Sequence, residues 1–530
     1  MGEFMRRFML AAIAAVSLVA PAPAQVLPSA DIDALLAALP GVVATYETKS
    51  DIGGVIALDG LKIAMKNPDG TPDEANKVVV RRAEATGLDA DAILAVFDGA
   101  RYGTEPDQTF RSLFSQLDLR DVSVVAGGKT VATIASWSAA SLEMKQFWFK
   151  PAADMRSQFG SDVEMAAKVL GNVLDSTRAG LSSISGLHLE IDTAAMAAAM
   201  APGTPMPPSQ GIEVYDYAEI TVDGFDRGRW GRMTWKGLSS RSPMPPLGEM
   251  SVSVAEGHWD GADVSKLLPW LMRAEWPPAE REGLVSFGAT CATSYVMSIP
   301  GVGTLDFPET CSEAIDFVWL IPVQVRIDMT GTFTPAPPGE FIAPPHVARH
   351  FKGPLDAGLT IEARYDPDAG TAALTHYGFR LGGFGSVDFS ATGGGLALAG
   401  LGLLPQTYAD MLTLNAAAVE LVDEGGVARI LEMAADTANA ESGGAGQVTA
   451  AALRLQAKAG LDMAAGMLGN SPEAAALIQP VKAFIDAGGT LTLRLAPPSP
   501  LRGADFEALA GKPPAEMLQI LGVEASHAAP

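Results

Sequence analysis

Alternation of apolar and polar residues is the clearest pattern along this chain. In residues 323–330, Val, Ile and Met side chains fall on one face and Gln, Arg, Asp and Thr on the other, as a half-buried antiparallel strand requires. The turn formers at 366–370 predict a reversal between two strands of the same kind. Strands are predicted at 250–254, 323–330, 359–365, 371–381, 384–389 and 491–495.

Helical spacing occurs in blocks between these groups of strands. The predicted helices cover 29–39, 163–174, 427–438, 448–467 and 472–487, and several are rich in Ala. Because the helices do not follow each strand in turn, the pattern favours an α+β fold over a parallel doubly wound sheet. We expect multiple antiparallel β-sheets, built as meanders and packed with Ala-rich helices.

A short Ala-Asp-apolar triplet recurs after three predicted strands. An Asp at this point can accept hydrogen bonds from the free amides of a following helix. We therefore interpret the triplets as helix starts in related strand-to-helix modules, and three equivalent acidic ligands are the weaker alternative. The triplets are Ala153-Asp154-Met155, Ala262-Asp263-Val264 and Ala504-Asp505-Phe506.

Pro and Gly residues mark the predicted boundaries between modules. They accumulate at 201–210 and at 335–339, which is typical of linkers. The predicted organisation is a signal peptide at 1–24, an N-terminal α+β module at 25–200, a Pro-rich linker at 201–210, a middle β-rich module with a disulfide at 211–334 and a C-terminal α+β module at 340–530.

The first 24 residues have the pattern of a secretory signal peptide. Arg6 and Arg7 precede an apolar run at 8–19, and small residues up to Ala24 fit a cleavage site. The apolar run is shorter than the ~20 residues that cross a bilayer, so an uncleaved anchor is the less favoured alternative. We expect a periplasmic or secreted protein with no transmembrane span after cleavage.

Composition and charge exclude several classes of protein. The 530 residues are 48% hydrophobic and 18% charged, which is typical of a folded, globular chain. The formal net charge of −24 repels phosphate backbones, so nucleic-acid binding is not expected.

The two cysteines, Cys291 and Cys311, lie 20 positions apart. In an exported protein such a pair predicts a disulfide, which would contribute about 3 kcal/mol by closing a loop of this length. A nucleophilic thiol or a metal pair is the alternative, but no His lies between His258 and His346.

His346 and His350 are the weak metal candidates. Four residues apart, they would share one face of a helix, as two zinc ligands can. The zinc-protease pattern needs a Glu directly after the first His, where this chain has Val347. A solvated helix start is the favoured interpretation, and no cofactor is expected.

His258 is the weak catalytic candidate. Asp260 and Asp263 follow it closely, and a His beside carboxylates can act as a general base. Glycines at 257 and 261 make a surface loop the favoured interpretation, and the segment 180–186 lacks the spacing of a serine-hydrolase elbow.

Aromatic residues suggest a further possibility. Phe147, Trp148 and Phe149 are consecutive, and five Trp residues lie between 230 and 276. Such clusters can line a groove for an apolar or carbohydrate ligand, although an ordinary core is the simpler explanation.

The C-terminal half resembles a known group of proteins. The motifs are 365–371 (YDPDAGT), 422–426 (VDEGG) and 489–493 (GTLTL), followed by Pro497 and by 521–523 (LGV). Together they resemble uncharacterised exported proteins of proteobacteria over about 355–525. The resemblance implies export, and it implies no activity.

From these observations we expect a non-catalytic envelope protein. It would bind an apolar ligand such as a lipid, or an envelope partner, through a sheet face or groove. A secreted hydrolase using His258 with the nearby Asp residues is one alternative, and a structural scaffold without a sizeable cavity is another.

Overall fold

The computed structural model divides the chain into two compact units, Met1–Pro277 (unit 1) and Pro278–Pro530 (unit 2). Their common boundary lies inside the range 211–334 that the sequence predicted as one middle module. The signal peptide and the linker at 201–210 lie outside the described residues. The structure describes residues 31–39, 41–67, 69–97, 108–148, 162–192, 211–245, 247–337, 339–401, 411–442, 448–468, 471–509 and 511–530.

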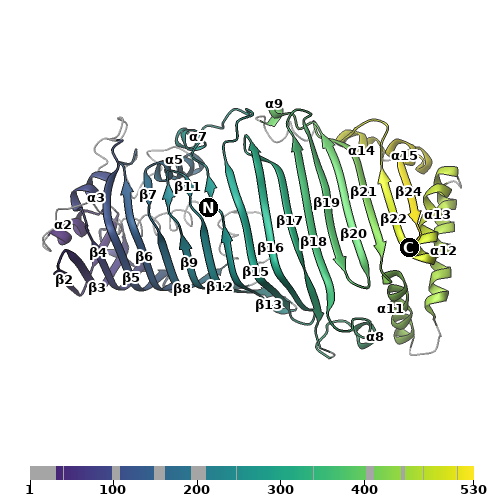
Figure 1. Cartoon of the computed structure of the whole chain (residues 1–530), viewed down its shortest axis with the longest axis horizontal. Helices are drawn as coiled ribbons and strands as arrows, with labels where there is room; N and C mark the ends of the chain where they lie inside the picture. Colours follow the sequence, from purple (N-terminus) through teal and green to yellow (C-terminus); the bar gives the residue numbers. More distant parts are fainter. Residues whose placement is uncertain are drawn as a thin grey trace. The chain divides into compact units, whose positions relative to one another are not determined.

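Unit 1 is an antiparallel meander with helices along it (Figure 1). Strands β1 and β2 both pair with β3, and the ladder continues through β4, β5, β6, β8, β9 and β12 to β13. A shorter ladder runs from β6 through β7, β10 and β11 to β14. The elements are α2 (Asp31–Ala38), β1 (Val42–Thr45), β2 (Thr48–Ile52), β3 (Val55–Lys66), β4 (Pro72–Thr86), α3 (Ala90–Phe97), β5 (Arg111–Ala126), β6 (Lys129–Met144), α5 (Asp162–Asp175), β7 (Thr177–Ala179), β8 (Ser182–Asp192), β9 (Ile212–Val222), β10 (Phe225–Asp226), β11 (Arg229–Trp230), β12 (Met233–Met244), β13 (Gly248–Trp259), β14 (Ala262–Asp263) and α7 (Leu268–Arg273).

Unit 2 is a second antiparallel meander. Its strands pair in chain order from β15 to β21; β21 then pairs with β22 and β23, and β22 pairs with β24. Helix α13 contacts β24 and β22, and with α11 and α12 it lies beside the last strands (Figure 1). The elements are β15 (Ser286–Ile299), β16 (Gly303–Val318), β17 (Ile321–Pro335), α8 (Pro345–Ala348), β18 (Leu355–Asp366), β19 (Thr371–Leu381), β20 (Gly385–Gly394), α9 (Leu398–Leu401), β21 (Thr413–Asp423), α11 (Gly426–Glu441), α12 (Ala450–Met467), α13 (Pro472–Ala487), β22 (Gly489–Leu495), β23 (Leu501–Arg502), α14 (Gly503–Leu509), α15 (Pro514–Leu521) and β24 (Val523–Ala528).

The predicted α+β fold with antiparallel meanders is confirmed. Helix α13 and strand β19 have the predicted limits. The strand predicted at 384–389 begins one residue before β20, and the other predicted strands are parts of longer ones. One helix start is wrong: Asp263 lies in the short strand β14, where its Oδ1 accepts a hydrogen bond from the amide of Ser265. Asp505 does lie in the first turn of α14, whereas Asp154 lies outside the described residues.

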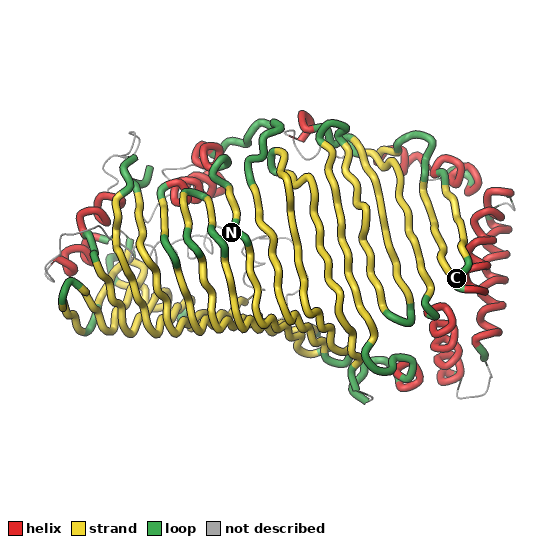
Figure 2. The backbone as a smooth tube through the Cα atoms, in the orientation of Figure 1, coloured by secondary structure: helices red, strands yellow, loops and turns green. Residues whose placement is uncertain are grey.

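A line of unpaired positions crosses the sheet of unit 1. On each of eight neighbouring strands, the pairing ladder skips a residue without any change of register, and between β9 and β12 it skips Tyr217 and Leu238 as well. The backbone φ is positive on every second strand, at Gly60, Asp121, Gly186 and Gly237. We call this the bend line, since the strands of unit 1 turn within their length (Figure 2). It comprises Gly60, Arg81, Asp121, Ala135, Gly186, Ala218, Gly237 and Ala255.

Glycine is needed on the bend line because neighbouring strands approach closely. A Cβ added at Gly237 would lie 2.9 Å from the Cβ of Ala218, and one at Gly186 would lie 2.8 Å from the Cβ of Ala135. Both glycines also have φ of +58°, a conformation that costs little for Gly alone.

The buried core is distributed unevenly within the described residues. In unit 1, helices α2 and α3 cover the first strands, and their Leu, Ile and Val side chains form one large cluster with those of β3, β4 and β5. In unit 2, the buried cluster contains only Trp319 and Tyr365, with half-buried neighbours. Helix α13 contacts the last strands of unit 2, and Leu398 of α9 packs against the cluster of Trp319 and Tyr365.

None of the helices among the described residues is both long and apolar enough to cross a lipid bilayer.

Candidate functional site

The candidate site of unit 2 is a pair of apolar rows that cross six strands at right angles. The register of β17 to β22 places one apolar residue of each strand in the first row and another, two positions away, in the second. At about 4.8 Å between strands, each row is about 24 Å long. The first apolar row of unit 2 is Ile327, Ile361, Tyr377, Phe389, Val419 and Leu493. The second row is Met329, Leu359, Phe379, Val387, Leu421 and Leu491.

The centre of these rows is exposed to solvent. Tyr377 is 52% exposed, Phe379 51%, Val387 45% and Phe389 36%. Tyr377 faces Phe389 and Phe379 faces Val387 across the β19–β20 ladder, so the four side chains form one patch. From typical aromatic side-chain areas the exposed part is roughly 300 Å², and covering it would contribute roughly 7 kcal/mol before any cost of binding. The largest apolar patch on a monomer is commonly about this size and is often functional.

Charged groups lie on the opposite face of the same strands and are paired there. The Nδ1 of His376 lies 2.9 Å from the Oδ2 of Asp388, and the guanidinium of Arg380 lies 3.0 Å from Glu424. The Arg364 guanidinium hydrogen-bonds Glu362 and lowers the pKa of that carboxyl. The two faces therefore have opposite character, and the apolar rows contain no ionisable side chain except the phenol of Tyr377.

A related pair of apolar rows flanks the bend line in unit 1. Because the bend line inserts one skipped residue, the two apolar residues of each strand are three positions apart, as in Leu58 and Leu61. The first apolar row of unit 1 is Leu58, Ala83, Leu119, Trp137, Ile184, Ile220 and Trp235, and it ends against Gly257. The second row is Leu61, Val80, Val122, Ile134, Leu187, Tyr217, Leu238 and Val254.

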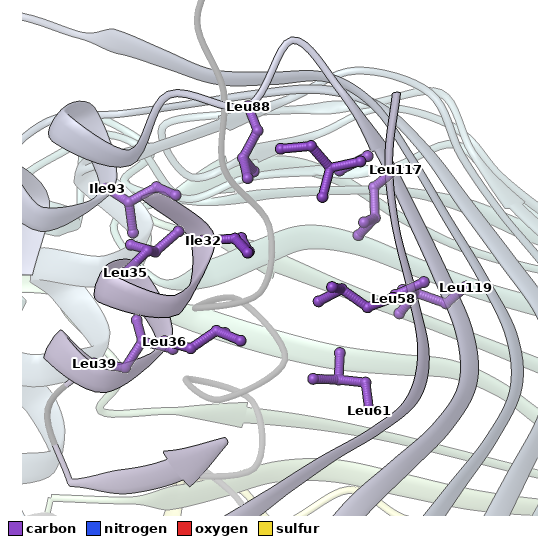
Figure 3. A pocket seen from close by; sticks show the side chains of 13 residues that line it. Ile32, Leu35, Leu36, Leu39, Leu58, Leu61, Leu88, Ile93, Leu117 and Leu119 are labelled. Carbon is purple, nitrogen blue, oxygen red and sulfur yellow. The ribbon is translucent and has the colours of Figure 1, made fainter. Parts of the chain in front are cut away.

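The first strands of these rows are covered by helices. In Figure 3, Leu58, Leu61 and Leu119 point from the strands towards Ile32 and Leu36 of α2, around a small cavity. Its volume of about 40 Å³ would hold a few water molecules at most, which is too small for an acyl chain. Further along, on β8, β9 and β12, the row residues are half-buried.

The structure places the weak catalytic candidates His258, Asp260 and Asp263 at the end of β13 and in β14. His258 lies on the polar face of β13, opposite Thr234, with its Nε2 3.9 Å from the Oδ1 of Asp260, beyond hydrogen-bonding distance. Asp263 pairs with Ser265 and Arg229 instead. Burial raises the pKa of its carboxyl, but the hydrogen bonds from Ser265 and the charge of Arg229 outweigh burial, so the pKa lies below its usual value. None of the predicted catalytic residues lines the cavity in Figure 3.

The structure places His346 and His350 in different surroundings. His346 lies within the four-residue helix α8, and its Nε2 is buried without a hydrogen-bond partner. His350 follows that helix, and its Nε2 lies 2.7 Å from the Oδ2 of Asp436 on α11. Within the described ranges, no three His, Cys, Asp or Glu side chains are grouped as metal ligands.

The cysteine pair is confirmed. Cys291 on β15 faces Cys311 on β16 across the ladder, with their Sγ atoms 2.15 Å apart. The pair joins neighbouring strands of unit 2 on the face opposite the apolar rows, since Cys311 also faces Asp328 on β17.

The predicted aromatic cluster is only partly brought together. Trp235 and Trp259 share the apolar face of unit 1, whereas Trp230 packs on Phe225 and Trp276 is 67% exposed. Of the consecutive aromatics at 147–149, Phe147 is buried and Trp148 exposed, and Phe149 lies outside the described residues.

Comparison with known proteins gives one result. A family model described as "Uncharacterized protein" matches residues 378–528. The match covers β20 to β24 and the helices between them, and it overlaps the region of the predicted resemblance, about 355–525. The searches of curated proteins and of solved structures find no match.

Sequence reasoning missed the residues that form the exposed patch. The strands that carry Tyr377, Phe379 and Phe389 were predicted, but these aromatics were not singled out as a surface. Their alternate spacing was a usable signal, because residues two apart on neighbouring strands gather on one face.

Proposed function

We propose that this protein is a non-catalytic binder of acyl lipids, which it holds on the apolar faces of its sheets. The observation that carries the proposal is the exposed centre of the apolar rows of unit 2, formed by Tyr377, Phe379, Val387 and Phe389. A soluble unit gains by covering such a surface.

The shape and chemistry of the rows favour an acyl chain over a protein partner. Each row runs for about 24 Å across the strands, which exceeds the length of one acyl chain, about half of the ~30 Å hydrocarbon core of a bilayer. Protein interfaces usually combine an apolar centre with a polar rim and several hydrogen bonds. Apart from the Tyr377 hydroxyl, the rows offer no hydrogen-bonding side chain.

Binding of a pyrene-labelled fatty acid to the purified full-length chain tests this proposal. Phe379→Asp places a charge at the centre of the patch and should weaken binding at least tenfold, because the charge must be desolvated beneath the acyl chain. Leu455→Asp is the matched control: Leu455 is 68% exposed on α12, a helix that contacts α11 and α13, and this variant should bind like the wild type.

Three results would count against the proposal. They are the absence of fatty-acid binding by the wild type, equal binding by the two variants, and a failure of every phospholipid tested to displace the bound probe. Capture of a specific envelope protein that is lost in Phe379→Asp, without lipid binding, would assign the patch to a protein partner instead.

We also propose that the protein is exported to the periplasm or secreted, like the proteobacterial proteins that its C-terminal half resembles. The support is the signal-peptide pattern at 1–24 together with the cysteine pair in unit 2. Fractionation and N-terminal sequencing test it: a mature chain beginning at Gln25 outside the cytoplasm is expected, and an uncleaved cytoplasmic chain would refute it.

A further inference from the structure

One hydroxyl group lies within the exposed centre of the apolar rows of unit 2. Tyr377, in the first row, is 52% exposed, and within the described residues no group hydrogen-bonds its hydroxyl. Tyr365, on the neighbouring strand β18, differs: it is 6% exposed, and its hydroxyl donates to the backbone oxygen of Leu396 at 2.8 Å. The Tyr377 hydroxyl is therefore accessible to a ligand, whereas the Tyr365 hydroxyl is held by the fold.

The surface around Tyr377 carries no charge. Besides this phenol, the two rows have only apolar side chains, and the neighbouring polar side chains of His376 and Asp388 lie on the opposite face. A carboxylate or phosphate on the rows would have no cation to pair with, and the net charge of −24 further repels an anion. A neutral carbonyl oxygen can accept the phenol hydrogen without either cost.

The size of the exposed patch fits a single chain better than a protein. A stable protein interface covers about 800 Å² on each partner, whereas the patch around Tyr377 exposes roughly 300 Å². An acyl chain is narrow enough to lie along one row, and an acyl ester has its carbonyl at one end of that chain. The row should therefore offer one hydrogen-bond donor followed by an apolar track.

The position of Tyr377 in the first row selects a direction for the chain. Phe389, Val419 and Leu493 follow it over three strand spacings, about 14 Å. Val419 and Leu493 are half-buried, so the exposed surface continues to β22. This distance matches one acyl chain, which is about 15 Å long, or half of the hydrocarbon core of a bilayer.

The other side of the row is shorter. From Tyr377, Ile361 and Ile327 extend it over two strand spacings, about 10 Å. On β16 the same row continues with the hydroxyl side chain of Ser312, so its apolar character ends there. The acyl chain therefore fits on the β20–β22 side, and the alcohol part of the ester lies towards β17.

We propose that unit 2 binds an acyl ester, whose carbonyl oxygen accepts the hydrogen bond of the Tyr377 hydroxyl and whose acyl chain lies along the first row from Phe389 to Leu493. This inference rests on the proposed function and deepens it, because it names acyl esters as the ligand class and assigns the direction of the chain. Tyr377 is the residue that distinguishes an ester from a plain hydrocarbon.

The test compares two probes of equal length, a pyrene-labelled fatty-acid methyl ester and a pyrene-labelled alkane, on the full-length protein. The wild type should bind the ester more tightly than the alkane. Tyr377→Phe keeps the ring but removes the hydroxyl, and it should weaken ester binding about fivefold while alkane binding stays unchanged. Tyr365→Phe is the matched control, since the Tyr365 hydroxyl already has a partner, and it should leave the ester-to-alkane ratio at the wild-type value.

Infrared spectroscopy checks the hydrogen bond directly. With a ¹³C-labelled ester carbonyl, the C=O stretching frequency should be lower in the complex with the wild type than in that with Tyr377→Phe, because the hydrogen bond weakens the C=O bond. An unchanged frequency or an unchanged ester-to-alkane ratio in Tyr377→Phe, with the alkane still bound, overturns this inference alone. Failure of the wild type to bind either probe or the labelled fatty acid overturns the proposed function and this inference together.

Nuclear Overhauser contacts between an unlabelled ester and methyl-labelled protein test the direction of the chain. The methoxy group of the ester should contact the methyl groups of Ile361, and the end of the acyl chain should contact those of Leu493. Contacts in the reverse order, or with neither residue, overturn the assigned direction.

Discussion

The buried ion pair of unit 1 provides the sharpest test of how this fold is stabilised. Lys145, just after β6, and Asp175, at the end of α5, have side chains only 4% and 8% exposed, with Nζ and Oδ2 2.5 Å apart. Arg227 donates to the other carboxylate oxygen at 2.7 Å, and Lys145 also donates to Gln108 at 2.9 Å. Replacing Asp175 by Ala leaves the Lys145 ammonium buried without its counter-charge.

We expect Asp175→Ala to lower the free energy of unfolding of unit 1 by about 3–5 kcal/mol, the usual cost of breaking a buried pair. That is a large part of the ~5–15 kcal/mol by which a domain is stable. Urea denaturation followed by Trp fluorescence measures it. The control is Glu74→Ala, which removes an exposed acid paired with Lys77 and should cost less than 1 kcal/mol. A loss below 1 kcal/mol for Asp175→Ala, with an unchanged dependence on urea, would refute the reasoning.

The same carboxyl should make stability depend on acid pH. Burial raises the pKa of Asp175, but the hydrogen bonds from Lys145 and Arg227 outweigh burial and lower it overall. Its stabilising contribution is therefore present above the unfolded pKa of about 3.9 and is lost as the pH falls through the lower folded pKa. The stability difference between the wild type and Asp175→Asn should shrink over that range, and a constant difference would contradict this assignment.

Three further changes should have measurable effects. Gly237→Ala should destabilise unit 1 by about 1–3 kcal/mol, because it adds a methyl group at positive φ against a neighbouring strand. Gly460→Ala, in α12 with open space around it, should instead stabilise the protein by about 0.5–1 kcal/mol. A change in melting temperature of the same sign in both variants would contradict the bend-line argument. The carboxylate of Asp216 raises the pKa of His188. The stabilisation from this His–Asp pair should therefore be present below about pH 6.5 and lost as the pH rises through the higher pKa of the folded state. An NMR titration of His188 that shows no upward shift of its pKa would refute this. Reduction of Cys291–Cys311 should lower the stability of unit 2 by about 3 kcal/mol, and an unchanged urea midpoint would exclude a stabilising role.

The bend line is a feature of unit 1 that the alternation of apolar and polar residues did not predict. In unit 2, apolar residues two positions apart, such as Tyr377 and Phe379, follow the ordinary strand period, and strand β19 was predicted with its observed limits. In unit 1, the corresponding residues are three apart, as in Ile184 and Leu187. A spacing of three breaks the period-two signal, so the continuity of these strands through the bend line was not predicted.

The sequence by itself determined the fold class, most of the long helices, several strands and the pairing of Cys291 with Cys311, because these depend on residues that are close along the chain or have one possible partner. Only the tertiary structure decided which apolar faces stay uncovered. Alternation shows that a strand has an apolar face, but the exposure of Phe379 depends on which helices and strands lie over that face, and those come from distant parts of the chain. The candidate site is therefore a property of packing, whereas the strands that carry it are a property of local sequence.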